Sequence, residues 1–250
     1  MSRLADDGDS LISHLIELRD RLMRAVFALI LAFIALVPFA NRWYRLLADP
    51  LLAKLPAGGH LVAIDVASPF FAPIKLTFFL ALMVAMPYIL YQIWAFVAPG
   101  LFKHERRVAR PILVSAVVLF YVGCAFAYFV MMPAMFAFLT ATAPEGVSMM
   151  TDISQYLDFV LIIFVSAGLA FEMPVAVLAL VALGLVTTAQ LREWRGYVVV
   201  GIFVVAAIIT PPDALSQLML AIPMTILYEV GIVAAGALAR GKKNDAEATE

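Results

Sequence analysis

Charged residues are scarce in this chain of 250 amino acids, and their scarcity excludes most classes of soluble protein. Asp, Glu, Lys and Arg make up 14% of the sequence, whereas 64% of it is hydrophobic. A soluble domain usually carries about 25% charged residues, because polar side chains must cover its surface. The composition also excludes a disordered chain and a nucleic-acid-binding protein with a basic face.

Cysteine and catalytic motifs are almost absent as well. Cys124 is the only cysteine, so no intramolecular disulfide bond and no thiolate metal cage can form, and we expect a small core residue there. The sequence contains no Gly-x-Ser-x-Gly, no His-Glu-x-x-His and no phosphate-binding glycine loop. The three histidines, at positions 14, 60 and 104, are scattered. We therefore predict that the protein is not an enzyme and has no metal site and no cofactor.

Six apolar runs predict six transmembrane helices. A bilayer core about 30 Å thick needs roughly 20 helical residues, and only helices or closed barrels satisfy their backbone in lipid. The runs lack the alternation of barrel strands. The predicted spans are 22–38, 70–97, 111–139, 156–186, 196–210 and 215–238. The predicted fold class is an all-α polytopic membrane protein with one domain over residues 1–240, followed by a disordered charged tail over 241–250.

The fifth run is unusually short. At about 1.5 Å per residue, residues 196–210 reach only about 22 Å before Pro211 and Pro212 end the helix. Such a helix either thins the bilayer or is covered by partner helices, and the alternative is a re-entrant pair that never crosses. Charge distribution favours a full crossing.

Lysine and arginine residues are concentrated in alternate loops. They precede the first span, lie between the second and third and between the fourth and fifth, and follow the sixth, whereas 139–156 and 210–216 contain none. Positive loops stay on the cytoplasmic side. The pattern predicts that both termini are cytoplasmic. The long connection 42–69 would then be external, and interfacial helices are expected in it.

A few polar residues interrupt the apolar runs, and such groups in lipid are functional candidates. Glu172 lies near the middle of the fourth run, where Pro174 is expected to kink the helix. Its role is either to face a ligand or partner or to form a structural hydrogen bond. Gln217 offers a hydrogen bond between helices. Asp213 either caps the sixth helix or has a functional role.

The N-terminal segment is predicted to form an amphipathic helix, because leucines at positions 11, 15, 18 and 22 share one face. Glu17 and Arg21 are spaced to form an ion pair on that helix. Glu105 stands among Lys103, Arg106 and Arg107 in the first basic loop. Two carboxylates, Glu17 and Glu105, are therefore expected at cytoplasmic helix ends amid excess positive charge.

Several short motifs follow one another along the chain. They are HLIELRDRL at 14–22, SPF at 68–70 with Lys75, WAFVAPGL at 94–101, KHERR at 103–107, Gly123 with FAYF at 126–129, FEMP at 171–174 and TPPD at 210–213. In this order they resemble the TatC family, the large subunit of the twin-arginine protein translocase. The match runs from about residue 13 to residue 236. Asp20 stands where a basic residue is common in the family.

The resemblance implies a six-helix, cupped arrangement with short fifth and sixth helices in a bacterial inner membrane. It implies a receptor that binds the twin-arginine signal peptides of folded cargo and nucleates a complex for proton-gradient-driven export. The partners that it implies are the single-span subunits TatA and TatB and further copies of the chain.

The resemblance also implies roles for single residues. Glu17 and Glu105 would meet the two arginines, with Arg19 in the same site. Glu172 would be a polar residue on the concave face, and Pro50 and Asp213 would be linked to translocation. Thr210 and Gln217 would lie where the single-span partners make contact.

Three other functions remain open on the residues alone. A small-solute transporter or channel would use Glu172, Lys75 and Glu229 as coupling groups. An intramembrane enzyme would need a nucleophile and base or a metal set, and a structural scaffold would leave the cytoplasmic carboxylates unexplained.

Overall fold

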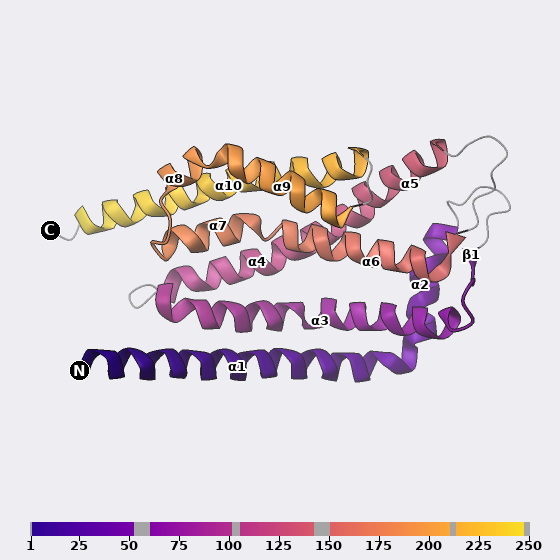
Figure 1. The fold of residues 1–250 in the computed structure, drawn as a ribbon, viewed down its shortest axis with the longest axis horizontal. Coiled ribbons are helices and arrows are strands. Elements are labelled where there is room, and N and C mark those ends of the chain that lie inside the picture. The colour runs from indigo at the N-terminus through magenta and orange to yellow at the C-terminus, as the bar shows by residue number, and fades with distance from the viewer. Residues whose placement is uncertain (1, 53–60, 102–105, 143–150, 211–213, 248–250) are drawn as a thin grey trace. The chain divides into compact units, whose positions relative to one another are not determined.

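The structure is a computed structural model that describes residues 2–52, 61–101, 106–142, 151–210 and 214–247 (Figure 1). Within them, five helical stretches are long and apolar enough to cross a membrane, and a sixth apolar helix is shorter. The long stretches are Ile12–Leu46, Ser68–Val97, Arg110–Phe138, Ile153–Ala182 and Ala214–Leu238, and the short helix is Arg195–Ile209. The prediction of an all-helical membrane protein with one short apolar helix is confirmed.

The chain divides into two compact units. Unit 1 comprises Met1–Leu113 and Met150–Leu157, and unit 2 comprises Val114–Met149 and Asp158–Glu250. The boundaries therefore fall inside two of the helices.

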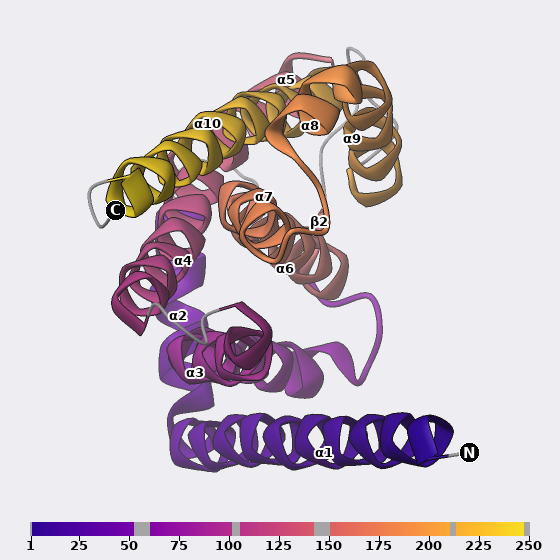
Figure 2. The same cartoon turned by 90° about the vertical axis from the view of Figure 1, so that its left-hand side faces the viewer.

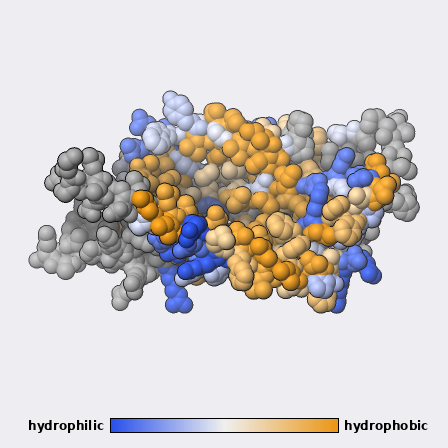
Figure 3. Space-filling view, turned by 60° about the horizontal axis from the view of Figure 1, so that its bottom comes forward, coloured by the Kyte–Doolittle hydropathy of each residue, from blue (hydrophilic) through white to orange (hydrophobic). Residues whose placement is uncertain are grey.

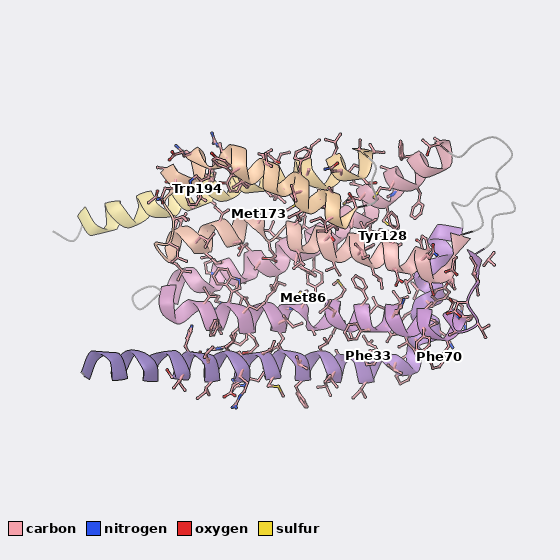
Figure 4. All side chains as sticks on the ribbon, viewed as in Figure 1. Phe33, Phe70, Met86, Tyr128, Met173 and Trp194 are labelled. Atoms are coloured by element: carbon pink, nitrogen blue, oxygen red, sulfur yellow. The ribbon has the colours of Figure 1, made fainter. Side chains whose placement is uncertain are left out.

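Unit 1 is organised around two long antiparallel helices, α1 (Ser2–Leu36) and α3 (Ser68–Leu101), which run side by side (Figures 1 and 2). His14 stacks on Phe96 with ring centroids 4.4 Å apart, and Phe33 meets Phe78 edge to face (Figure 4). A short helical turn, η1 (Val37–Phe39), leads from α1 into α2 (Ala40–Leu52), which also packs on α3. The amphipathic N-terminal helix and the first span are thus one continuous helix.

Two short strands tie two connections of unit 1 together. β1 (Leu61–Val62) pairs in parallel with β2 (Thr151–Asp152). The backbone N–H of Ile64 donates to Asp152 Oδ1 at 3.4 Å, and the Ser154 hydroxyl donates to Ser68 Oγ at 3.0 Å. No strand was predicted, because two residues carry no visible alternation.

Unit 2 contains most of the remaining helices. They are α4 (Arg106–Phe126), η2 (Ala127–Met131), α5 (Met132–Ala141), α6 (Ile153–Ala170), α7 (Met173–Ala182), α8 (Thr188–Glu193), α9 (Arg195–Ile209) and α10 (Ala214–Glu247). Two of them, η2 and α6, end a few residues before a proline. Proline has no N–H and its ring crowds the carbonyl four residues before. Before Pro133 the helix therefore widens into the π-helical turn η2, and before Pro174 it breaks between α6 and α7.

Two turns fix the path from α7 to α9. Gly184 has φ +72° and ends α7 in a Schellman motif, in which Leu185 N–H donates to Leu180 O and Gly184 N–H to Val181 O. Thr187 and Gln190 then form a reciprocal capping box that begins α8. These local bonds let a six-residue helix form at the end of the apolar segment.

α10 differs from the expected short sixth helix. It runs over 34 residues, and its apolar stretch Ala214–Leu238 is 25 residues long, so the prediction of a short sixth helix is wrong. The helix also continues to Glu247, beyond the point at which a disordered tail was predicted to begin. Lysine, alanine and glutamate favour a helix there, which explains the continuation.

Apolar side chains cover much of the surface, as a lipid-embedded protein requires. Figure 3 shows a broad apolar area on the face that carries α1. Exposed large side chains of α1 include Leu22, Phe27, Leu31 and Ile34. In water such a surface would aggregate, whereas lipid solvates it.

The contact between α4 and α6 depends on a glycine. A Cβ on Gly123 of α4 would lie 2.5 Å from the backbone oxygen of Ala167 on α6. We expect Gly123→Ala to push the two helices apart and to lower stability by about 1–3 kcal/mol. Thermal unfolding in detergent measures this effect. Gly236→Ala is the matched control, because nothing lies within 4 Å of the added carbon; equal midpoints for the two variants would contradict the prediction.

Candidate functional site

Glu17 lies on α1 and forms an ion pair with Arg21, one turn further along. Arg21 donates through Nε at 2.9 Å and through Nη2 at 2.6 Å, both to Glu17 Oε1. The Glu17 side chain is 37% exposed and that of Arg21 is 21% exposed. The pair expected from the i,i+4 spacing is therefore present, and its carboxylate stays open to solvent.

Arg19 points to a different acid on the same helix. Its Nε and Nη2 donate to Asp20 Oδ1 at 3.1 Å and 2.9 Å, and both side chains are exposed. Two acids and two arginines thus form two separate pairs within five residues. The charges on this turn are therefore balanced locally.

The C-terminal part of α3 lies beside this turn. The stacking of His14 on Phe96 places the turn of α1 that precedes Glu17 beside the C-terminal part of α3. Glu105 lies outside the described residues, and the same is true of Asp213. Pro50 falls within α2, and its side chain is outside the described part.

Glu172 occupies the break between α6 and α7. Its N–H donates to Leu169 O, and its carbonyl accepts from Ala176 N–H. Its side-chain Oε1 is buried and has no hydrogen-bond partner among the described residues. The kink expected from Pro174 is present as a complete break, and Met173 begins the next helix (Figure 4). The break leaves a carboxyl oxygen that the fold itself does not use.

Gln92 on α3 is a second such group, and the sequence reasoning missed it. Its side chain is 4% exposed, and its Oε1 lacks a partner in the described structure. The signal that would have found it is its position as an amide inside the apolar run 70–97.

The short helix α9 is bound to α10 by polar contacts. Gln217 of α10 donates through Nε2 to Phe203 O of α9 at 3.1 Å, so the expected hydrogen bond between helices is present. Arg195 and Glu229 form an ion pair of 2.6 Å between the same helices. Thr210 is buried and donates to Ala206 O within α9. These contacts fix α9 along α10 (Figure 2).

α8 is held on α10 by a buried tyrosine. The Tyr228 hydroxyl donates to Leu191 O at 2.7 Å, and both residues belong to a core cluster with Val177 and Ile232. Trp194 marks the junction at which α8 passes into α9 (Figure 4). The position at which α9 begins is therefore fixed by the packing of α8 on α10.

Among the described residues, no group of three or more His, Cys, Asp or Glu side chains is placed to hold a metal ion. Cys124 is a buried free thiol, as expected of a core residue.

Comparison with known proteins decides the family. Residues 13–223 match the family model "Sec-independent protein translocase protein (TatC)". The chain belongs to the TatC family. Membership of this family makes it a twin-arginine translocase receptor subunit and not an enzyme, which also replaces the small-solute transporter interpretation.

TatC proteins from other bacteria resemble the chain over most of its length. TatC proteins of Azotobacter chroococcum mcd 1 and Escherichia coli (strain K12) are each 53% identical to it, over 91% of this chain and 89% and 88% of the respective relative. A crystal structure of the twin arginine translocase receptor TatC superposes with a TM-score of 0.79 at 35% identity. The superposition covers 91% of this chain and 99% of the chain in the crystal structure. The TatC fold is thus shared over nearly the whole TatC-family chain.

The tyrosine that anchors α8 gives a testable stability effect. We expect Tyr228→Phe to lower stability by about 1 kcal/mol, because a buried hydrogen bond to Leu191 O is lost while the packing volume is kept. Thermal unfolding of the purified protein measures it. Tyr197→Phe is the control, since Tyr197 is 82% exposed. A Tyr228→Phe midpoint equal to that of the control would show that the bond contributes nothing.

Proposed function

We propose that the chain binds the twin-arginine signal peptides of folded cargo proteins through the carboxylates of Glu17 and Glu105, with Arg19 nearby. The observation that carries the proposal is that Glu17 already holds a guanidinium, that of Arg21, through two hydrogen bonds. The Glu17 side chain is thus partly exposed and is placed to accept hydrogen bonds from a guanidinium. Membership of the TatC family supports the same role.

The covalent path supports a joint site for the two acids. Glu105 follows the last residue of α3, Leu101, by four residues, a stretch that spans at most about 14 Å. The His14–Phe96 contact places the C-terminal part of α3 beside the turn of α1 that precedes Glu17. We therefore propose that two adjacent arginines of one peptide reach both carboxylates.

Arginine is favoured over lysine for a physical reason. A planar guanidinium donates several hydrogen bonds in a fixed geometry, whereas an ammonium is a point charge that keeps its hydration. An exposed pair contributes up to about 1 kcal/mol, and burial beneath a bound peptide increases that value. Two acids that read two arginines therefore give useful discrimination.

Neutralising either carboxylate tests this function. We expect Glu17→Gln and Glu105→Gln each to reduce crosslinking of a twin-arginine peptide severalfold while membrane insertion stays normal, because amides lose the charge-assisted bonds. The measurement is site-specific photocrosslinking in membranes, with a twin-lysine peptide as the control ligand. Unchanged crosslinking in both variants would remove the site.

The proposed cellular setting follows from the family and from the charge pattern. We place the chain in a bacterial inner membrane with both termini cytoplasmic, because the basic loops alternate. We propose that the helices form a cupped arrangement. The single-span subunits TatA and TatB would contact the region of Thr210 and Gln217, and several copies of the chain would assemble. Pro50 and Asp213 would act in translocation, which the proton gradient drives.

Glu172 suits a later step than arginine recognition. Its unpartnered buried Oε1 and the break before α7 support a polar point that draws the signal peptide into the membrane. An ionisable side chain inside a membrane is energetically costly, and such residues commonly mark functional sites. A proton relay is not part of the proposal.

Truncation of this side chain separates the two steps. We expect Glu172→Ala to leave twin-arginine crosslinking at Glu17 unchanged and to reduce cargo export by at least about tenfold, a loss equivalent to 1.4 kcal/mol. Export of a reporter cargo measures the second step. The control is Glu229→Gln, because that acid is held in an ion pair with Arg195. Normal export in Glu172→Ala would return Glu172 to a structural role.

A further inference from the structure

The guanidinium on Glu17 belongs to the receptor itself. Arg21 forms with Glu17 the same kind of contact that the proposed function assigns to the cargo's arginine. The geometry points to Arg21 as an internal competitor, which occupies the Glu17 carboxylate in the free receptor and must be displaced by the signal peptide. This inference rests on the proposed function and adds the residue that sets the affinity of the site.

The atoms involved allow an exchange without a bare intermediate. Both donors of Arg21 bind a single carboxylate oxygen, Oε1, at 2.9 Å and 2.6 Å. The structure records no hydrogen bond to Glu17 Oε2 from any described residue. An incoming guanidinium can therefore engage Oε2 before Arg21 leaves Oε1. At each stage the carboxylate keeps at least one charged partner.

A simple helix-stabilising pair is the other role open to these residues. Glu and Arg at i,i+4 contribute little to an isolated helix, and α1 is held by its packing on α3. The two roles differ in what the loss of Arg21 does to ligand binding. Loss of a helix-stabilising residue weakens binding or leaves it unchanged, whereas loss of a competitor strengthens it.

The chain offers a matched control for the loss of charge. Removal of any cation near the site would strengthen the attraction for a cationic peptide at long range. Arg24 lies one turn beyond Arg21 on α1 and is exposed, and the structure records no bond between it and Glu17. Arg24→Gln therefore removes the same charge without removing the competitor.

The experiment measures the binding of a fluorescent twin-arginine peptide to the full chain in lipid nanodiscs. We expect Arg21→Gln to bind the peptide about twofold to fivefold more tightly than the natural protein. We expect Arg24→Gln to change the free energy of binding by less than half as much. The gain of Arg21→Gln corresponds to about 0.4–1 kcal/mol, the range of a partly exposed ion pair. Arg21→Lys is expected to fall between the two, since an ammonium holds the carboxylate less well.

A double variant shows whether Arg21 acts through Glu17. In a Glu17→Gln background we expect Arg21→Gln to add no affinity, because there is no carboxylate left to release. A gain of the same size in both backgrounds would overturn the inference, as would equal gains for Arg21→Gln and Arg24→Gln. Unchanged or weaker binding by a well-folded Arg21→Gln protein would overturn it as well; circular dichroism and gel filtration establish the fold.

Failure of the proposed function has a different signature. If the natural protein bound twin-arginine and twin-lysine peptides equally, or Glu17→Gln bound as well as the natural protein, both the function and the competitor would be wrong. If Glu17→Gln weakened binding and Arg21→Gln brought no gain, the function would stand and only the competitor would be wrong.

Discussion

The chain must satisfy its polar groups internally wherever lipid surrounds it, and this constraint organises the structure. Five hydroxyl groups in or at the end of the described apolar helices solve the problem in the same way, by donating to the carbonyl four residues before. They belong to Thr77, Thr142, Ser166, Thr210 and Thr225. Against this background two side-chain oxygens are conspicuous, because Glu172 Oε1 and Gln92 Oε1 are buried and find no partner in the described residues. The groups that the fold leaves unused are those available to a ligand.

The same constraint explains why the interruptions of the helices matter. A proline removes one N–H donor and so leaves a carbonyl that must find another partner or turn away. At Pro174 the result is a full break, and Glu172 is the residue placed in it. At Pro133 the result is the milder π-helical turn η2. Backbone irregularity and polar chemistry therefore occur together at Glu172, whereas η2 bears no acidic or basic residue. Only the first of these has the properties of a site.

Sequence reasoning recovered the apolar spans well, since their lengths follow from lipid thickness. The second to sixth spans agree with the structure to within a few residues, whereas the first was placed at 22–38 and extends over Ile12–Leu46. Hydropathy stopped at the charges from Glu17 to Arg24, but no glycine or proline between residues 9 and 36 ends the helix there. The Glu17–Arg21 pair was predictable from its i,i+4 spacing. The Arg195–Glu229 pair was not, because its members are 34 residues apart and meet only through the packing of α9 on α10.

An occupied carboxylate changes how a receptor of this kind gains selectivity. If Glu17 were bare, any cation near the membrane surface would gain the full strength of an ion pair there. Because Arg21 already holds it, a ligand gains only the difference between its own contact and that of Arg21. A ligand with a single arginine then gains little binding free energy. A peptide that engages a second acid at the same time gains from linkage, since the first contact raises the effective concentration of the next cation. Under the proposed function, recognition of a pair of arginines thus follows from two acids, one of which is held by an arginine of the receptor.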